Sequence, residues 1–214
     1  MGTISESFGN LGDYLLAEKK KSQGRRVEVD LVLSKILKPF LPSGMRYGTG
    51  TIADIKDRHA GPIDIVASTE SFPPFGDGQA SAYLADGVLF CLQVKDWSQN
   101  DLTEFGALAQ QIKTLERKKK NLIPCLAVSF GLLPLPELNS FLKSAAGESV
   151  DGVICLGHHF VLRNSQGLYG DPKTVPFVTE SPGPEALKAF AFYLMQLSQA
   201  ALGLPFGLID YQHL

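Results

Sequence analysis

Three residues could do chemistry together because of their types and spacing: Asp64, Gln93 and Lys95. Asp64 lies inside the short β-branched run 63–67, where a lone carboxylate is costly to bury without a partner. Gln93 and Lys95 lie two residues apart at the end of the apolar run 87–95, and strand residues at that spacing share a face. If the two predicted strands pair, the three side chains converge on one rim of a sheet.

Such a rim would hold the groups that a Mg²⁺- or Mn²⁺-dependent phosphodiesterase needs. Asp64 would bind the hard cation, and the side chain of Gln93, or the backbone carbonyl beside it, would add an oxygen ligand. Lys95 would orient or activate water and offset charge on the phosphate in the transition state. Glu28, in the first turn of a predicted helix, is the natural further ligand or water-binding carboxylate.

Each of these residues also has an ordinary structural interpretation. Asp64 could be a turn or capping acid at the start of a strand, and Gln93 with Lys95 could be a polar pair where a strand leaves the core. Glu28 could serve its helix alone, because a carboxylate in the first turn interacts favourably with the positive end of the helix dipole. The residue pattern by itself leaves both interpretations open.

Apolar periodicity predicts the elements that would position these side chains. An amphipathic helix over 26–41 would carry Glu28, and a capping box with Asp101 as N-cap and Glu104 three residues later predicts a helix over 101–119. The order of elements predicts an α/β fold in which a helical crossover links parallel strands. The other predicted elements are helices over 4–21, 134–145 and 185–202 and strands over 45–52, 83–85, 122–130, 152–156 and 159–163.

The chemistry-bearing residues resemble the PD-(D/E)XK nuclease superfamily, in which Asp is followed, after a long interval, by (Asp/Glu/Gln)-x-Lys at a strand end. The glutamine variant resembles modification-dependent and defence-associated restriction nucleases. Two positions depart from the superfamily pattern: Ile63 stands where proline is common, and Gln93 stands where most members carry an acid. Over 25–138 the chain also resembles the bacterial DUF6602 family, in the motifs Arg25-Arg26-Val27-Glu28, Leu41-Pro42, Tyr47-Gly48-Thr49-Gly50, Ile63-Asp64-Ile65-Val66 and Gln93-Val94-Lys95.

This resemblance implies a restriction-endonuclease-like fold, a mixed central sheet flanked by helices with the metal at one edge. It implies Asp64, Gln93 and Glu28 as metal ligands and Lys95 as the catalytic lysine. In related nucleases the helix after the lysine lies beside the metal and carries groups that meet the phosphate, although a basic helix end is most often simply solvated. The predicted nucleic-acid-binding residues of this region are Gln111, Lys113, Arg117 and Lys118.

Composition limits the class of protein. The chain has 214 residues, of which 44% are apolar and 20% charged, and this is typical of a globular protein. A net charge of −2 argues against a general nucleic-acid coat protein but is compatible with a local basic groove. Cys91, Cys125 and Cys155 follow no zinc pattern, and their odd number in apolar runs predicts reduced, buried thiols. The sequence has no signal-peptide pattern and no apolar run of about 18 residues, so we expect a cytoplasmic protein without a membrane span.

We therefore expect a nuclease-like core over 25–165, preceded by a helical extension over 1–24 and followed by a loop and a helix over 166–214 that pack on the core. The expected function is Mg²⁺- or Mn²⁺-dependent hydrolysis of DNA, or less readily RNA, phosphodiester bonds in prokaryotic defence. A homodimer is plausible, because cutting both strands of a duplex usually needs two sites. The alternative function is a catalytically inactive nuclease fold that binds a protein partner or acts in immunity, which the missing acid at Gln93 favours.

Overall fold

The computed structural model describes residues 3–22, 24–76, 81–118, 121–164, 171–181 and 183–202. Within them, eight strands form one mixed sheet in the order β3-β1-β2-β4-β5-β6-β7-β8. β1 and β3 are parallel, as are β4, β5 and β6, whereas the other neighbours run antiparallel. The strands are β1 (Met45–Ala53), β2 (His59–Thr69), β3 (Ser81–Leu84), β4 (Val88–Val94), β5 (Cys125–Ser129), β6 (Gly152–Cys155), β7 (His159–Arg163) and β8 (Phe177–Glu180).

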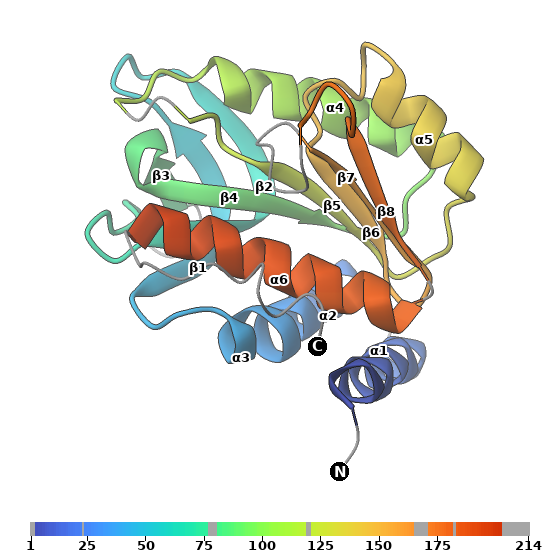
Figure 1. The fold of residues 1–214 in the computed structure, drawn as a ribbon. Helices are drawn as coiled ribbons and strands as arrows, with labels where there is room; N and C mark the ends of the chain where they lie inside the picture. The colour runs from blue at the N-terminus through green and yellow to red at the C-terminus, as the bar shows by residue number, and fades with distance from the viewer. Residues whose placement is uncertain are drawn as a thin grey trace.

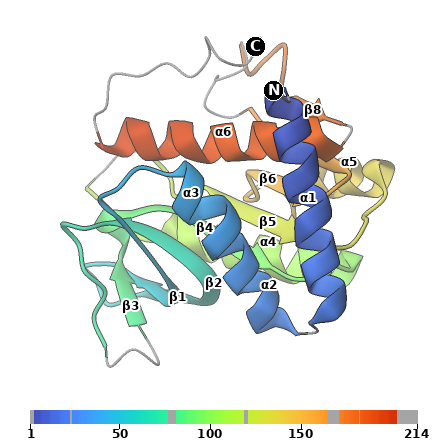
Figure 2. The same ribbon diagram turned by 90° about the horizontal axis from the view of Figure 1, so that it is seen from below.

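Helices cover both faces of this sheet (Figure 1). One face carries α4 (Gln99–Thr114) and α5 (Leu135–Lys143), which are the crossovers between the parallel strands β4, β5 and β6. Figure 2 shows the helices of the other face: α1 (Ile4–Lys21), α6 (Gly183–Leu202), and a continuous helix made of α2 (Arg25–Leu31), η1 (Val32–Leu37) and α3 (Lys38–Phe40). A short 3₁₀ turn, η2 (Ala85–Gly87), leads into β4. The predicted fold class, a mixed sheet flanked by helices, is confirmed.

Two hydrophobic cores fix the position of β4, one on each face of the sheet. Phe90 and Leu92 pack in the core beneath α1, α2 and α6, whereas Cys91 packs in the core beneath α4 and α5. A strand covered on both faces reads as a continuous apolar run, which is why the sequence predicted β4 as central. Its carboxyl end, where Gln93 and Lys95 lie, is therefore anchored on a rigid strand. Among the described residues no helix is long and apolar enough to cross a membrane.

The helix that carries Glu28 is not α-helical throughout. Its middle segment, η1, is a π-helix, in which the N–H of Lys38 donates to the carbonyl of Leu33, five residues earlier. Val32, Ile36 and Leu37 of this segment are buried in the core, as the predicted apolar stripe requires. The prediction of one helix over 26–41 is thus right in extent, while the π turn left no signal in the apolar pattern.

The predicted start and end of α4 are wrong. Its N-cap is Ser98, and Asp101 is the third residue of the helix, where it completes the capping box that we had assigned to Asp101 and Glu104. The helix ends at Thr114, because Leu115 adopts an extended ψ of 135°. Charged residues with good helix propensity follow and favoured a longer prediction.

A strand in the Pro/Gly-rich region 170–184 was also missed. β8 lies there and pairs antiparallel with β7, although the region had been interpreted as a loop. Residues 170 and 182 of that region, the preceding residues 165–169 and the chain end 203–214 lie outside the described residues. The division of the chain at residues 24 and 165 stays a prediction.

Candidate active site

The middle of β2 and the carboxyl end of β4 bring Asp64 and Gln93 into direct contact. The strands are antiparallel neighbours, with Ile65 opposite Leu92. The backbone N–H of Asp64 donates to Gln93 Oε1 over 3.0 Å, and the backbone N–H of Val94 donates to Asp64 Oδ2 over 2.8 Å. The Asp64 carboxylate is thus fixed on the rim of the sheet by the strand that carries Gln93.

Asp64 also has a cationic partner from α2. Arg25 donates to Asp64 Oδ2 from Nη2 over 2.8 Å and from Nε over 3.2 Å. The Asp64 side chain is 12% exposed, whereas the Arg25 side chain is 50% exposed. A carboxylate this buried needs a compensating charge, which Arg25 supplies while its guanidinium still reaches solvent.

Helix α4 holds Lys95. The Lys95 ammonium pairs with Asp101 and lies 5.2 Å from the centroid of the Trp97 ring. Asp101 also accepts hydrogen bonds from the hydroxyl and the backbone N–H of Ser98. These hydrogen bonds, with that from Lys95 first, hold the pKa of Asp101 well below its usual range. Asp101 therefore stays ionised at neutral pH and keeps the ammonium of Lys95 in place.

A cavity of about 220 Å³ lies over this end of β4. Trp97 forms part of its wall: the indole is 8% exposed, donates to the carbonyl of Val128 over 2.9 Å and packs against Phe105. The indole therefore packs over the strand end and does not present a free face to a base. The lining residues are Arg25, Pro62, Gln93, Lys95, Trp97, Asp101, Glu104, Phe105 and Leu108.

Glu28 lines a neighbouring cavity of about 530 Å³. It is buried and pairs over 3.3 Å with Lys19 of α1, which also pairs with Asp96. Burial alone would lower the pKa of Lys19, but the carboxylates of Asp96 and Glu28 raise it above its ordinary value. Among the described residues, no three acidic, histidine or cysteine side chains lie close enough together to hold a metal ion. Glu28 and Asp64 thus occupy separate ion pairs.

Asp64 on the rim and Glu28 in the neighbouring cavity nevertheless offer oxygen donors whose chemistry suits a hard divalent cation. Asp64 and Glu28 are nearly buried carboxylates, each neutralised by a basic side chain of the same chain. The hydrogen bonds that the described residues donate to the Asp64 carboxylate all end on Oδ2. Oδ1 is therefore the oxygen that a cation would approach, and carboxylate oxygens are the ligands that Mg²⁺ and Mn²⁺ prefer.

Two of the predicted nucleic-acid-binding residues lie at the other end of β4. Arg117 Nη2 donates over 3.1 Å to the carbonyl of Val88, the first residue of the strand. The backbone N–H of Lys118 donates over 2.6 Å to Asp86. Since Gln93 lies near the last residue of β4, this basic segment does not flank the rim. Its role with nucleic acid stays a prediction.

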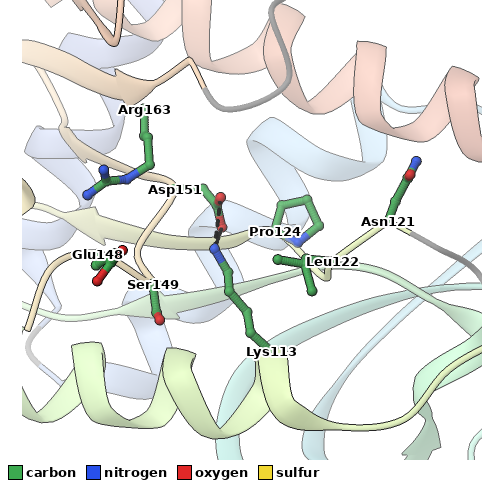
Figure 3. A pocket seen from close by; sticks show the side chains of 8 residues that line it. All are labelled: Lys113, Asn121, Leu122, Pro124, Glu148, Ser149, Asp151 and Arg163. Atoms are coloured by element: carbon green, nitrogen blue, oxygen red, sulfur yellow. Dashed lines mark hydrogen bonds and ion pairs between the residues drawn. The ribbon is translucent and has the colours of Figure 1, made fainter. Parts of the chain in front are cut away.

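The other two, Gln111 and Lys113, lie on α4. Gln111 is exposed, and Lys113 borders a cavity of about 710 Å³ beside the first residues of β5 and β6 (Figure 3). Lys113 pairs there with Asp151 over 3.0 Å, and burial raises the pKa of Asp151 although Lys113 opposes that shift. This cavity is larger than the one over Lys95, but Lys113, Asp151 and Arg163 in its lining are engaged within the chain. Arg163, for instance, donates to the backbone carbonyls of Leu142, Gly147 and Val150.

The sequence reasoning predicted the acids and the lysine of the candidate site but did not predict their ion-pair partners. Arg25 precedes Glu28 by three residues, which puts both on one side of the helix, so its placement near the site had a signal. Asp101 had a signal in the pattern Ser98-x-x-Asp101, which is a capping box. Lys19 had none, because lysines at the end of a helix are favourable in any case.

Comparisons with known proteins support the fold. No family model matches the chain, and no curated protein matches it. Among solved structures, E. coli NucC in its cAAA-bound form superposes with a TM-score of 0.74 at 17% identity, over 100% of this chain and 97% of that chain. P. aeruginosa NucC, also cAAA-bound, gives a TM-score of 0.72 at 15% identity over 94% and 92% of the two chains. The apo form of E. coli NucC gives 0.71 at 16% identity over 99% and 98%.

This chain has the NucC fold. At identities this low the similarity concerns the fold alone, and it agrees with the restriction-endonuclease-like architecture expected from the sequence. The resemblance to the DUF6602 family stays a prediction.

Proposed function

We propose that this chain is a metal-dependent nuclease that hydrolyses DNA phosphodiester bonds in prokaryotic defence, with Asp64, Gln93, Lys95 and Glu28 as its site. The observation that carries the proposal is the contact between Asp64 and the strand end 93–95 in a chain with the NucC nuclease fold. The defence role is supported by the same fold and by the glutamine variant of the motif.

Each residue has a distinct part in the proposed reaction. Asp64 and Glu28 would hold the divalent cation, which, when bound, supplies Lewis-acid polarisation and lowers the pKa of a water molecule. Gln93 keeps the backbone of Asp64 in position through the hydrogen bond from the Asp64 N–H. Lys95 carries the positive charge that stabilises the negative charge developing on the phosphate. Asp101 is a positioning residue, because it acts through Lys95.

The test is cleavage of plasmid DNA with Mg²⁺ or Mn²⁺, with and without cAAA, because NucC was solved bound to that molecule. We expect cleavage by the unaltered protein and a loss of at least about 100-fold in Lys95→Ala, the usual scale for removing a group that stabilises transition-state charge. Lys173→Ala is the matched control: the Lys173 side chain is exposed and its backbone N–H makes the contact with Asp171, so cleavage should persist. Equal cleavage by Lys95→Ala would reject the assigned site. A single-stranded RNA substrate in parallel tests the preference for DNA.

A catalytically inactive binding protein is the second candidate function. It is favoured by the neutral Gln93 and by the pairing of Asp64 with Arg25, which leaves less negative charge for a cation. Calorimetry with Mn²⁺ separates the two candidate functions. An inactive protein would fold normally and bind no cation, and Asp64→Asn would then leave the calorimetric signal unchanged. The mass of the protein in solution, measured by light scattering, tests the proposed homodimer.

A further inference from the structure

Arg25 faces two environments at once. Its guanidinium donates two hydrogen bonds to Asp64 Oδ2, and the same side chain lines the cavity over Gln93 and Lys95. With half of its surface exposed, it is held on one side only. A guanidinium that lines a cavity and still has unused N–H donors suits an oxyanion, because its five N–H groups can donate to more than one oxygen.

The pair between Arg25 and Asp64 opposes cation binding at the same carboxylate. A guanidinium at 2.8 Å neutralises the charge that would attract a cation and repels the cation itself. The opposition is lost if Arg25 turns toward a phosphate in the cavity, since phosphate then supplies the charge that Asp64 gave.

We infer that Arg25 exchanges partners: it is the counter-ion of Asp64 in the metal-free protein and a ligand of the substrate phosphate once a divalent cation occupies Asp64. This inference rests on the proposed function. The exchange makes cation binding and DNA binding cooperative. A cation at Asp64 releases Arg25 to bind a phosphate of the DNA, and a phosphate that binds Arg25 leaves the Asp64 carboxylate free for the cation.

Lys19 does not have this freedom. Its ammonium is engaged by two carboxylates, those of Glu28 and Asp96, and its side chain is only 22% exposed. Arg26, by contrast, is exposed, adjacent to Arg25 in sequence and carries the same charge. It is therefore the matched control for a long-range effect of charge.

The first experiment measures Mn²⁺ affinity by calorimetry in the absence of nucleic acid. We expect Arg25→Gln to bind Mn²⁺ about three- to tenfold more tightly than the unaltered protein, the scale of one partly exposed charge pair. Arg26→Gln should change the affinity by less than about twofold. Equal affinities for the Arg25→Gln and unaltered proteins, or a weaker one for Arg25→Gln, would overturn the exchange.

The second experiment measures binding of a short DNA duplex in a Lys95→Ala background, which prevents cleavage. With Mn²⁺ present, Arg25→Gln should weaken DNA binding by about tenfold and flatten its salt dependence by about one phosphate contact, whereas without Mn²⁺ it should have little effect. Weakening to the same extent with and without Mn²⁺ would show that Arg25 never exchanges partners. Asp64→Asn identifies a different failure: if it binds Mn²⁺ as well as the unaltered protein, the proposed metal site is wrong whatever Arg25 does.

Discussion

Replacing Lys113 with methionine should destabilise the protein in a manner that depends on pH. The change removes the cation of a nearly buried ion pair, whose side chains are 14% and 6% exposed, and leaves the Asp151 carboxylate behind. Asp151 keeps the hydrogen bond from the backbone N–H of Cys125 at 2.8 Å but loses the charge that compensates its own. Breaking a buried pair in this way costs about 3–5 kcal/mol.

Protonation of Asp151 limits this cost. From the ordinary pKa of 3.8, neutralising the carboxyl costs about 1.36 kcal/mol per pH unit, hence about 5 kcal/mol near pH 7.5 but only about 2 kcal/mol near pH 5.5. Burial raises the pKa of Asp151, so the stability that it contributes is greatest below its ordinary pKa and is lost as the pH rises toward the folded-state pKa. Lys113→Met should therefore lose about 3–5 kcal/mol near pH 7.5 and about 2 kcal/mol near pH 5.5.

Urea unfolding followed by circular dichroism at the two pH values measures this difference. Adding Asp151→Asn to Lys113→Met should restore most of the stability, since no charge is then left buried. Lys56→Met is the control, because the pair of Lys56 with Glu116 is exposed and is worth less than about 1 kcal/mol at either pH. Equal losses at both pH values would refute the reasoning. Weaker DNA binding by Lys113→Met at unchanged stability would instead favour the nucleic-acid role predicted from the sequence.

The remaining predictions concern the site and two points of the fold. Gln93→Glu adds the acid of the superfamily pattern and should tighten Mn²⁺ binding in calorimetry about tenfold, since carboxylate charge sets cation affinity; unchanged affinity would remove Gln93 from the site. Asp54→Asn should cost about 2–3 kcal/mol in urea, because this buried carboxylate accepts four hydrogen bonds, one of them from the N–H of Glu116. Burial opposes ionisation of Asp54, but those donors lower its pKa, so this stability should be lost in acid. Gly106→Ala should cost about 2 kcal/mol, because the new Cβ would lie 2.0 Å from the carbonyl oxygen of Ala146; unfolding at the unaltered urea concentration would show that α4 can shift.

Local pattern was enough to predict the fold class and the rim. The apolar run of β4 and the β-branched run of β2 identified two buried strands, and the structure shows that they pair, which the sequence analysis had taken as a condition. The end of α4 could not be predicted in the same way. The segment after Thr114 leaves the helix and bonds to Asp54 and Asp86, which lie far away in sequence. Helix propensity depends only on the residues of the segment itself and carries no information about such distant partners.

The same limit applies to the site. The types and spacing of Asp64, Gln93 and Lys95 predicted them on or beside two neighbouring strands, and the structure has Asp64 within β2, Gln93 near the end of β4 and Lys95 directly after it. What sequence could not tell was that Arg25 and Asp101 would pair with them, because an ion pair depends on the three-dimensional path of two segments and on which charge lies within reach. The basic residues after the site were interpreted from their sequence proximity, whereas the intervening helix α4 carries the chain back, so that Arg117 lies at the opposite end of β4.

The π-helical segment η1 sets the phase of the helix that carries Arg25 and Glu28. A π turn amounts to one residue more than the α-helix needs, and one residue corresponds to a rotation of about 100° about the axis. Deleting a single codon within 32–37 would restore a regular α-helix and turn Arg25 away from Asp64 and Glu28 away from Lys19 together. The register of this one helix therefore sets the direction of both the counter-ion of Asp64 and the carboxylate of Glu28.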